Sequence, residues 1–398
     1  MPLIKAASEA HMWDTPVRAS KPRMSEADIE EKYASREERI VTESNREKLP
    51  NFVEALKRPN YMNVRPFYQR RPRWDAMRQS RLIESFIMNV PVPPLFVYET
   101  QLNTYEVMDG QQRITAIQSF YMNELKLTGL ERWPELNGRT YLRLPEKIRA
   151  GIDRRSISYT VLMHESAQRE EDAMLLKQLV FERLNTGGVK LSHQEVRNCL
   201  YQGLFNSLLL ELSRTNAFRR AWGLPEYADR EESQPPKELL DDAFYSQMGD
   251  IETILRFFAL RFADQYQRGM QGFLDLYMAR ARRFTSADMN VLRDLFLDTI
   301  SLAERVYGEQ LFRPWDTKRK QWEARPQKAF CDAVLVGMSR HIGHARELEE
   351  RQGDIVRATR ALFEAHPSGT FTGRKNTKAD VEGRIDLYSD MLSRALSE

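Results

Sequence analysis

The chain has 398 residues, of which 41% are hydrophobic and 29% are charged, a composition that excludes a disordered protein and allows two or three globular domains. Its 60 basic and 57 acidic residues leave a formal charge of +3, which neither requires nor excludes a nucleic-acid partner. The two cysteines, Cys199 and Cys331, support neither a disulfide framework nor a metal site. No apolar stretch approaches the ~20 residues that span a bilayer, and no apolar leader opens the chain, so we expect a cytoplasmic protein without a membrane partner.

The N-terminal half predicts a polar arm followed by a mixed unit of helices and strands. Residues 1–45 are polar, and Ser25 and Asp28 stand in capping-box spacing, so we expect an arm that carries one solvated helix. Because Pro66 and Pro72 exclude a regular helix, the segment around them is expected to be extended. The other elements expected here are helices at 44–58 and 77–90, strands at 91–100 and 104–110, a helix at 111–125, a small helix near 145–155 and a strand at 157–163.

Helical periodicity dominates from residue 170 onward. The expected helical stretches are 170–185, 192–214, 247–267, 285–308, 328–343 and 378–396. No fixed-period repeat occurs, which argues against a solenoid. The predicted fold class is therefore α+β, with the polar arm at 1–45, a mixed domain at 46–200 and an all-helical domain at 201–398. Long apolar helices after residue 240 offer surface for a homo-oligomer.

The stretch VMDGQQRIT places polar and charged side chains around a glycine at one strand-to-helix turn. A helix that starts here directs unpaired N–H groups and a positive dipole end to one point, and Gly110 lets the chain turn tightly and a ligand approach closely. Gln111 and Gln112 add neutral donors and acceptors, and Arg113 adds a planar fork that suits phosphate oxygens. The turn therefore predicts a phosphate site, in which Asp109 could orient a water, bind a ribose hydroxyl or hold a metal ion already bound to phosphate.

The same turn also has a purely structural interpretation. Asp109 would cap the helix, and Arg113 would pair with a nearby acid on the surface. The motif taken alone leaves both interpretations open.

A second cluster follows the helix predicted at 170–185. It consists of Asn185, Thr186, Gly187 and Gly188. Its amides and hydroxyl, together with Arg197 and Asn198 one turn into the next helix, can complete a phosphate or base site. An ordinary connection between two helices explains the same spacing, because glycine ends helices and Ser192 with Glu195 forms a capping box.

A third cluster interleaves basic and aromatic side chains around Pro72. Its members are Tyr68, Gln69, Arg70, Arg71, Arg73 and Trp74. Such a loop suits phosphate contacts and base stacking, so we expect it to contact DNA. The alternative is a solvated basic loop without a ligand.

Taken in order, FYQRRPRWD, LIESFIMNVPVPPLFVYE, VMDGQQRITAIQSFY and FERLNTGGVKLSHQEVRN resemble the N-terminal domain family of GmrSD-type restriction endonucleases. The resemblance covers residues from about 50 to 260. It implies a fold similar to ParB and sulfiredoxin, a small mixed sheet with helices whose strand–turn–helix motif binds nucleotide phosphates. It also implies binding and hydrolysis of an NTP, which could be GTP, ATP or CTP, together with Mg²⁺.

The resemblance assigns roles to the residues that match the family's motifs. Asp109, Gln112 and Arg113 are expected to act in catalysis. The residues expected to bind the nucleotide are Gln69, Arg70, Gly110, Gln111, Asn185, Thr186, Gly187 and Gly188.

The function that the resemblance implies is bacterial defence. We expect an NTP-hydrolysing sensor subunit of an anti-phage or restriction-type system, which couples recognition of modified or phage DNA to a separate HNH-type nuclease. The alternative is a non-catalytic regulatory module that binds DNA or a nucleotide in the same pocket.

The C-terminal half departs from relatives that carry their own HNH-like nuclease. That chemistry needs a histidine base beside metal ligands on a β-hairpin and a helix. His341 and His344 lie in a helical stretch without a preceding hairpin, and a third ligand is not apparent. We therefore expect surface histidines, no metal site and no nuclease activity from this chain alone.

Overall fold

The computed structural model describes residues 4–14, 25–26, 30, 41–63, 74–163, 180, 192–201, 203–232, 235–366, 369–373 and 376–397. The chain forms two compact units, one from residues 19–191 and one from residues 1–18 and 192–398. We call them the mixed unit and the helical unit. The helix expected at 170–185 and most of the one expected after Ser25 lie outside the described residues.

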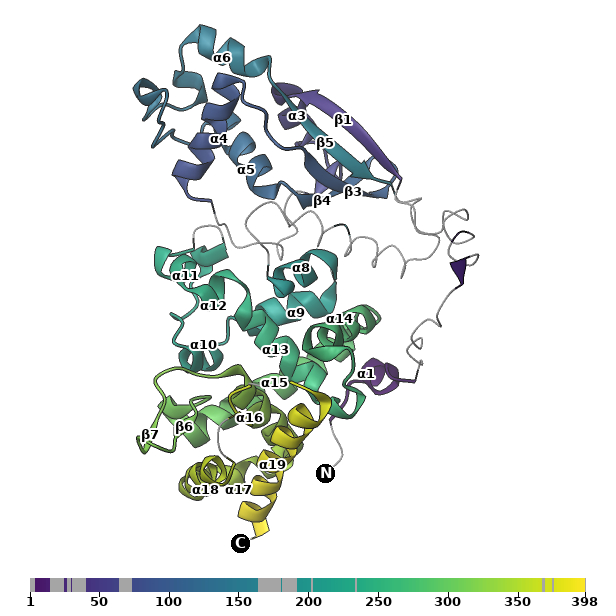
Figure 1. Ribbon diagram of the computed structural model, residues 1–398, viewed down its shortest axis with the longest axis vertical. Coiled ribbons are helices and arrows are strands. Elements are labelled where there is room, and N and C mark those ends of the chain that lie inside the picture. The colour runs from purple at the N-terminus through teal and green to yellow at the C-terminus, as the bar shows by residue number, and fades with distance from the viewer. Residues whose placement is uncertain are drawn as a thin grey trace. The chain divides into compact units, whose positions relative to one another are not determined.

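The mixed unit is built on a five-stranded sheet (Figure 1). Its strands are β1 (Thr42–Lys48), β2 (Met62–Asn63), β3 (Leu95–Gln101), β4 (Thr104–Asp109) and β5 (Ser156–Leu162). They lie in the order β1-β5-β3-β4-β2, with antiparallel β1–β5 and β3–β4 pairs and parallel β3–β5 and β2–β4 pairs. The small mixed sheet with helices, followed by a helical region, confirms the predicted α+β class.

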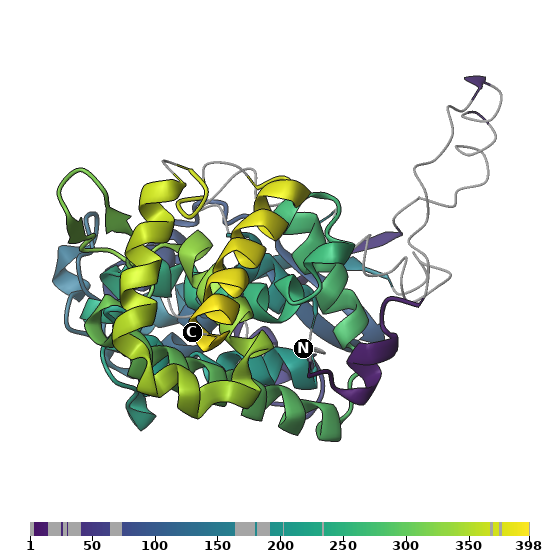
Figure 2. The same cartoon turned by 90° about the horizontal axis from the view of Figure 1, so that it is seen from below.

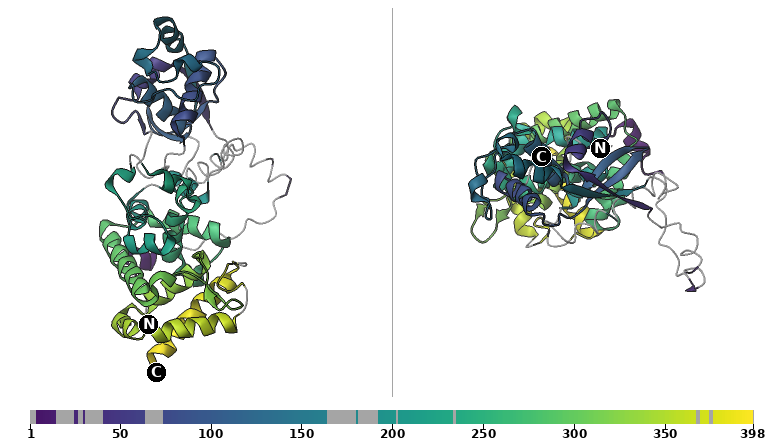
Figure 3. Two further views of the ribbon diagram at one scale, coloured as in Figure 1. Left: turned by 90° about the vertical axis from the view of Figure 1, so that its left-hand side faces the viewer. Right: turned by 90° about the horizontal axis from the view of Figure 1, so that it is seen from above.

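The helices of the mixed unit lie beside its sheet (Figures 1 and 3) and share one apolar core with the strands. They are α3 (Leu49–Ala55), α4 (Ala76–Met88), α5 (Gln111–Tyr121) and α6 (Glu146–Asp153), with the 3₁₀ turns η1 (Pro134–Leu136) and η2 (Tyr141–Arg143). In β5, the alternate residues Ile157, Tyr159 and Val161 enter this core, as the period of two along a strand requires. The predicted helix at 77–90 and the two strands on either side of residue 102 are confirmed within a few residues.

Strand β1 corrects an expectation from the sequence. Residues 44–48 were expected to begin a helix, but they pair with β5 in register from Thr42↔Leu162 to Lys48↔Ser156. The strand is polar and largely exposed, so it lacks the alternation of apolar residues that identifies a half-buried strand. Its partner β5 lies far along the chain. The periodicity of a sequence does not reveal which distant segments pair.

The helical unit contains α1 from the N-terminus and the helices after residue 192 (Figures 1 and 2). Its α-helices are α1 (Ala7–His11), α8 (His193–Leu200), α9 (Leu204–Leu212), α10 (Asn216–Trp222), α11 (Lys237–Asp241), α12 (Ala243–Ser246), α13 (Gly249–Leu260), α14 (Gly269–Ala281), α15 (Ser286–Tyr307), α16 (Lys328–Arg340), α17 (Ala345–Glu350), α18 (Gln352–Ala365) and α19 (Lys378–Ser397). Short 3₁₀ turns lie at Asp229–Glu232, Ala263–Gln265, Gly308–Gln310 and Ile342–His344, and a two-stranded hairpin is formed by β6 (Trp315–Asp316) and β7 (Gln321–Trp322). Every helix in the described part of the chain is too short or too polar to cross a bilayer.

One detail of the helical unit explains a difference from a predicted element, and a second shows how closely two of its helices pack. The stretch at 192–214 was expected to be helical throughout, but it divides into α8 and α9 at Gly203, whose φ of +143° is incompatible with a helix. Helix α16 is buried along most of its length, and α19 approaches it closely at Gly337, where a Cβ atom would lie 2.5 Å from Cδ1 of Tyr388.

The N-terminal segment is part of the helical unit's core. Glu9 is fully buried, and its carboxylate accepts hydrogen bonds from Arg261 at 3.0 Å and from the Tyr277 hydroxyl at 2.6 Å. Trp13 stacks on a phenylalanine of α14. Residues 4–14 therefore are not the loose polar arm expected from composition, because the buried acid Glu9 has buried partners more than 250 positions later.

Candidate nucleotide site at the β4–α5 turn

The DGQQR motif forms the turn from β4 into α5. Asp109 is the last residue of β4, Gly110 is the N-cap, and Gln111 is the first residue of α5. Gly110 has a φ of +101°, and a Cβ atom there would lie 2.3 Å from Cδ2 of Leu95. Glycine is therefore required at this position, both for the backbone conformation and for the close approach of β3. The predicted strand–turn–helix geometry is confirmed.

Asp109 and Arg113 form an ion pair across the first turn of α5. The Nη2 atom of Arg113 donates to Oδ2 of Asp109 at 2.5 Å, and its Nη1 atom donates to the carbonyls of Pro93 at 2.5 Å and Pro94 at 3.2 Å. The Arg113 side chain is 12% exposed and that of Asp109 is 37% exposed. We expected the fork of Arg113 to bind phosphate oxygens, but both of its terminal nitrogens bind groups of the protein itself.

The start of α5 presents backbone donors without a side-chain cap. The carbonyl of Gly110 accepts the first helical hydrogen bond, from Ile114 at 2.9 Å. Among the described residues, no side chain accepts a hydrogen bond from the amides of Gln111 and Gln112. Asp109 is not the helix cap that the structural interpretation required, because its carboxylate is bonded to Arg113. The free amides and the positive end of the helix dipole can attract an anion.

The two glutamines differ in their access to a ligand. Gln111 is 8% exposed, whereas Gln112 is half-buried and lies one position further along α5. A ligand above the turn can therefore reach the side-chain amide of Gln112 more readily than the side-chain amide of Gln111.

The other residues expected at this site lie outside the described residues. These are Gln69, Arg70, Asn185, Thr186, Gly187 and Gly188. Their roles stay predictions, and the structure brings together only the five residues of the DGQQR motif.

Arg197 and Asn198, which could have completed a phosphate site, are both buried in the helical unit. Arg197 donates to the carboxylate of Asp275 at 2.6 Å and to the backbone carbonyl of Gln271 at 3.0 Å. Ser192 and Glu195 form the predicted capping box at the start of α8. Arg197 has a structural role, since its guanidinium is already bonded to acidic and polar groups.

The late histidines follow α16 and lie apart from any carboxylate cluster. The ring of His341 is 3.1 Å from the Ser389 hydroxyl, and burial lowers its pKa. His344 is 3.0 Å from Glu347. Across the described ranges, no group of three or more His, Cys, Asp or Glu residues is arranged to hold a metal ion.

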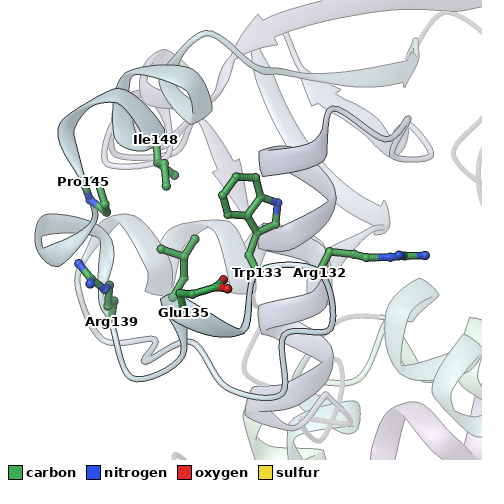
Figure 4. Close-up of a pocket in the computed structure, with 7 residues that line it drawn as sticks. Arg132, Trp133, Glu135, Arg139, Pro145 and Ile148 are labelled. Carbon is green, nitrogen blue, oxygen red and sulfur yellow. The ribbon is translucent and has the colours of Figure 1, made fainter.

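The mixed unit also has an open pocket of about 400 Å³ that the sequence did not indicate (Figure 4). A loop from Arg132 to Arg139 lines one side, and Pro145 and Ile148 at the start of α6 line another. The buried carboxylate of Glu84 anchors this loop by accepting hydrogen bonds from three successive backbone amides, at residues 131–133. In the sequence, the signal for this pocket is Trp133, an aromatic residue in a loop. Such a residue is a weak indication of a pocket.

Comparison with known families places the mixed unit in a recognised class of domain. Residues 49–202 match the family model of the GmrSD restriction endonuclease, N-terminal domain. This stretch begins at α3, ends just after α8, and includes the whole DGQQR turn. Residues 49–202 are therefore a domain of the GmrSD N-terminal family, and the predicted resemblance is confirmed. Comparison with curated proteins and with solved structures finds no match.

Proposed function

We propose that the chain is the NTP-binding and NTP-hydrolysing sensor subunit of a bacterial restriction or anti-phage system. The family of residues 49–202 links the chain to restriction and defence proteins. The observation that supports nucleotide chemistry is a carboxylate, Asp109, paired with Arg113 beside an uncapped helix N-terminus.

Phosphate binding would rely on the backbone of the turn. The amides of Gln111 and Gln112 point to the N-terminal side of α5, where the helix dipole favours an anion. The carboxylate of Asp109 would repel a phosphate if it stood alone, but Arg113 neutralises it at 2.5 Å. Gly110 lets the backbone turn tightly into α5, because a Cβ atom there would meet Leu95 at 2.3 Å.

Hydrolysis would use the oxygen of Asp109 that Arg113 does not bind. The Asp109 side chain is 37% exposed, so its Oδ1 atom can orient an attacking water or supply one ligand to Mg²⁺. One carboxylate suffices for this fit, because Mg²⁺ in nucleotide sites keeps several waters and is held mainly by the phosphates. Gln112 would orient the same water, and Arg113 would act as a positioning residue for Asp109.

The proposal extends to partners. A sensor without its own nuclease would couple DNA recognition to a separate HNH-type subunit, and the basic loop at 68–74 would contact the DNA. Binding and hydrolysis of the nucleotide would couple DNA binding by the sensor to the activity of the nuclease.

A second candidate function has its own support. Arg113 also donates to the carbonyls of Pro93 and Pro94, contacts that a purely structural arginine would make. In this view the turn is a rigid element of a module that binds DNA or a nucleotide without cleaving it.

A phosphate-release assay over the four NTPs separates the two functions. The full-length protein is measured with no DNA, with unmodified DNA and with modified DNA. We expect turnover of at least one NTP, and we expect its loss in Asp109→Ala and in Arg113→Ala with the fold retained by circular dichroism. Turnover that persists in either variant, or NTP binding without any phosphate release by the wild type, would overturn the hydrolytic assignment.

A further inference from the structure

The helical unit carries a short β-hairpin, β6–β7, at its edge in Figure 1. Its strands pair through Trp315↔Trp322 and Asp316↔Gln321. Two further backbone hydrogen bonds extend the ladder below the strands, from Glu323 to the carbonyl of Pro314 and from residue 327 to that of residue 312, both at 2.8 Å. The two arms of the hairpin are therefore held together from the strands down to Phe312 and Gln327.

The base of the hairpin is an aromatic and cationic stack. The rings of Trp315 and Trp322 meet at 69° with centroids 5.4 Å apart. The guanidinium of Arg360 on α18 lies 4.7 Å from the Trp315 centroid and 5.8 Å from that of Trp322. Such contacts fix the orientation of a hairpin that is too short to be stable alone.

The tip is also held in one conformation. The Oδ1 atom of Asp316 accepts hydrogen bonds from the amides of Lys318 at 2.9 Å and Arg319 at 3.0 Å, and these contacts lower the pKa of Asp316. The Lys320 ammonium binds Glu364 on α18 at 2.6 Å. The tip therefore presents three consecutive basic residues from a preorganised turn.

Positive charge is concentrated on this hairpin and its flanks. Residues 313–328 hold six basic and two acidic side chains, a net charge of +4, whereas the whole chain carries +3. Arg319 is 77% exposed, and its Nε atom is 3.8 Å from Asp316. Lys318 and Arg325 are exposed too, and no carboxylate among the described residues pairs with either. Lys318 and Arg325 thus face solvent without an ion pair in the described part of the chain, and Arg319 adds a largely exposed guanidinium whose ion pair with Asp316 is long.

We propose that the β6–β7 hairpin is a binding site for the phosphate backbone of duplex nucleic acid. A turn whose backbone is already fixed loses little backbone entropy when its adjacent cations meet a regular array of phosphates. A two-stranded ribbon also has a width that the major groove of B-DNA accepts. The contact would be independent of sequence, since lysine and arginine side chains on phosphates read no base edges. It does not depend on nucleotide hydrolysis by the mixed unit.

Salt dependence of binding tests the proposal. Full-length protein is titrated into a labelled, unmodified duplex of about 30 base pairs, without nucleotide, from about 50 to about 200 mM salt. The variant Lys318→Gln/Arg319→Gln/Arg325→Gln removes the three exposed cations and keeps Lys320, whose ion pair with Glu364 holds the tip. We expect weaker binding and a slope of log K against log salt that is less steep by about 2 to 3, because each lost phosphate contact removes about 0.9.

A matched variant controls for net charge. Arg305→Gln/Arg346→Gln/Lys378→Gln removes three cations, one each on α15, α17 and α19, that pair with acids on α17 and α19. We expect its salt slope to stay at the wild-type value, and thermal unfolding to show that both variants fold.

Equal effects of the two triple variants, an unchanged slope in the hairpin variant, or no duplex binding by the wild type would overturn the proposal. So would hairpin-dependent binding to an acidic peptide or to phosphatidylserine vesicles without binding to the duplex. NTP turnover measured without DNA is a separate readout, so this proposal and the proposed hydrolysis can fail independently.

Discussion

The Oδ2 atom of Asp109 and the Nη2 atom of Arg113 lie 2.5 Å apart across the first turn of α5. The two residues that we expected to perform separate tasks at a phosphate site therefore form one unit. Arg113 also reaches back to two backbone carbonyls before β3, so this unit is fixed to the adjacent strand. The position of the Asp109 carboxylate consequently depends on the length and shape of the arginine side chain.

Arg113→Lys tests this dependence on shape. A lysine keeps the positive charge, but a single ammonium cannot reproduce the planar fork that bonds to Asp109 and to the Pro93 carbonyl together. We expect kcat for NTP hydrolysis to fall on the order of 100-fold, the range seen when one positioned polar group of an active site is lost. Steady-state kinetics should show a smaller change in KM. Arg81→Lys, at an exposed ion pair with Glu131, is the control and should retain activity.

Gly110→Ala tests the conformation of the turn. Its φ of +101° and the 2.3 Å approach of Leu95 to an added Cβ atom make alanine costly, and we expect a loss of roughly 1 to 3 kcal/mol in the free energy of unfolding. Gly151→Ala in α6 is the control, because an added Cβ atom there meets nothing within 4 Å and alanine favours a helix. Urea unfolding followed by circular dichroism would show destabilisation by the first change and not by the second. Equal stability of the two variants would contradict the strained turn.

Much of the mixed unit could be predicted because its signals are local. Helix α4 follows from the spacing of Leu82, Ile83 and Phe86, which are all buried. The turn at Gly110 follows from a glycine between an apolar strand and a helix start. In each case the residues that determine the structure are neighbours in the sequence.

The parts that were not predicted depend on residues far apart in the chain. Strand β1 is polar and owes its place to β5, and the buried Glu9 owes its place to Arg261. The hydrogen bonds of Arg113 to the Pro93 and Pro94 carbonyls depend on how α5 sits beside β3. No periodicity or motif encodes such partners, so the sequence placed the DGQQR residues at one turn but did not reveal how their side chains are bonded.

Glu84→Gln tests the anchor of the loop that lines the open pocket. The Glu84 carboxylate is 4% exposed and accepts hydrogen bonds from three backbone amides, at 2.8, 3.0 and 3.3 Å. A neutral amide has one acceptor oxygen, and its NH₂ group would face amide donors, so we expect a loss of about 2 to 3 kcal/mol in stability. Hydrogen exchange at Arg132 and Trp133 should become faster. Glu54→Gln, at an exposed pair with Lys57, should change stability by less than about 0.5 kcal/mol.

Asp288 makes the stability of the helical unit depend on pH. Burial disfavours its charge, but hydrogen bonds from Thr285 and Ser8 prevail and lower its pKa to about 2. A carboxyl whose pKa is lower in the folded state contributes stability above its unfolded pKa of 3.8, and this contribution is lost as the pH falls toward 2. The difference corresponds to about 2 kcal/mol.

The measurement compares wild type with Asp288→Asn by urea unfolding between pH 5 and pH 2. Wild type should be more stable by about 2 kcal/mol or more at pH 5, and most of this advantage should disappear at the acidic end. Asp354→Asn, at an exposed ion pair with Arg357, serves as the control and should follow the wild-type pH profile. A constant difference between wild type and Asp288→Asn across the whole range would mean that the folded protein does not hold this carboxyl in its charged form. Because Ser8 belongs to the N-terminal segment, a weaker pH dependence in Ser8→Pro, which lacks the backbone donor but keeps the Thr285 contacts, would show that this segment stays docked on α15 in solution.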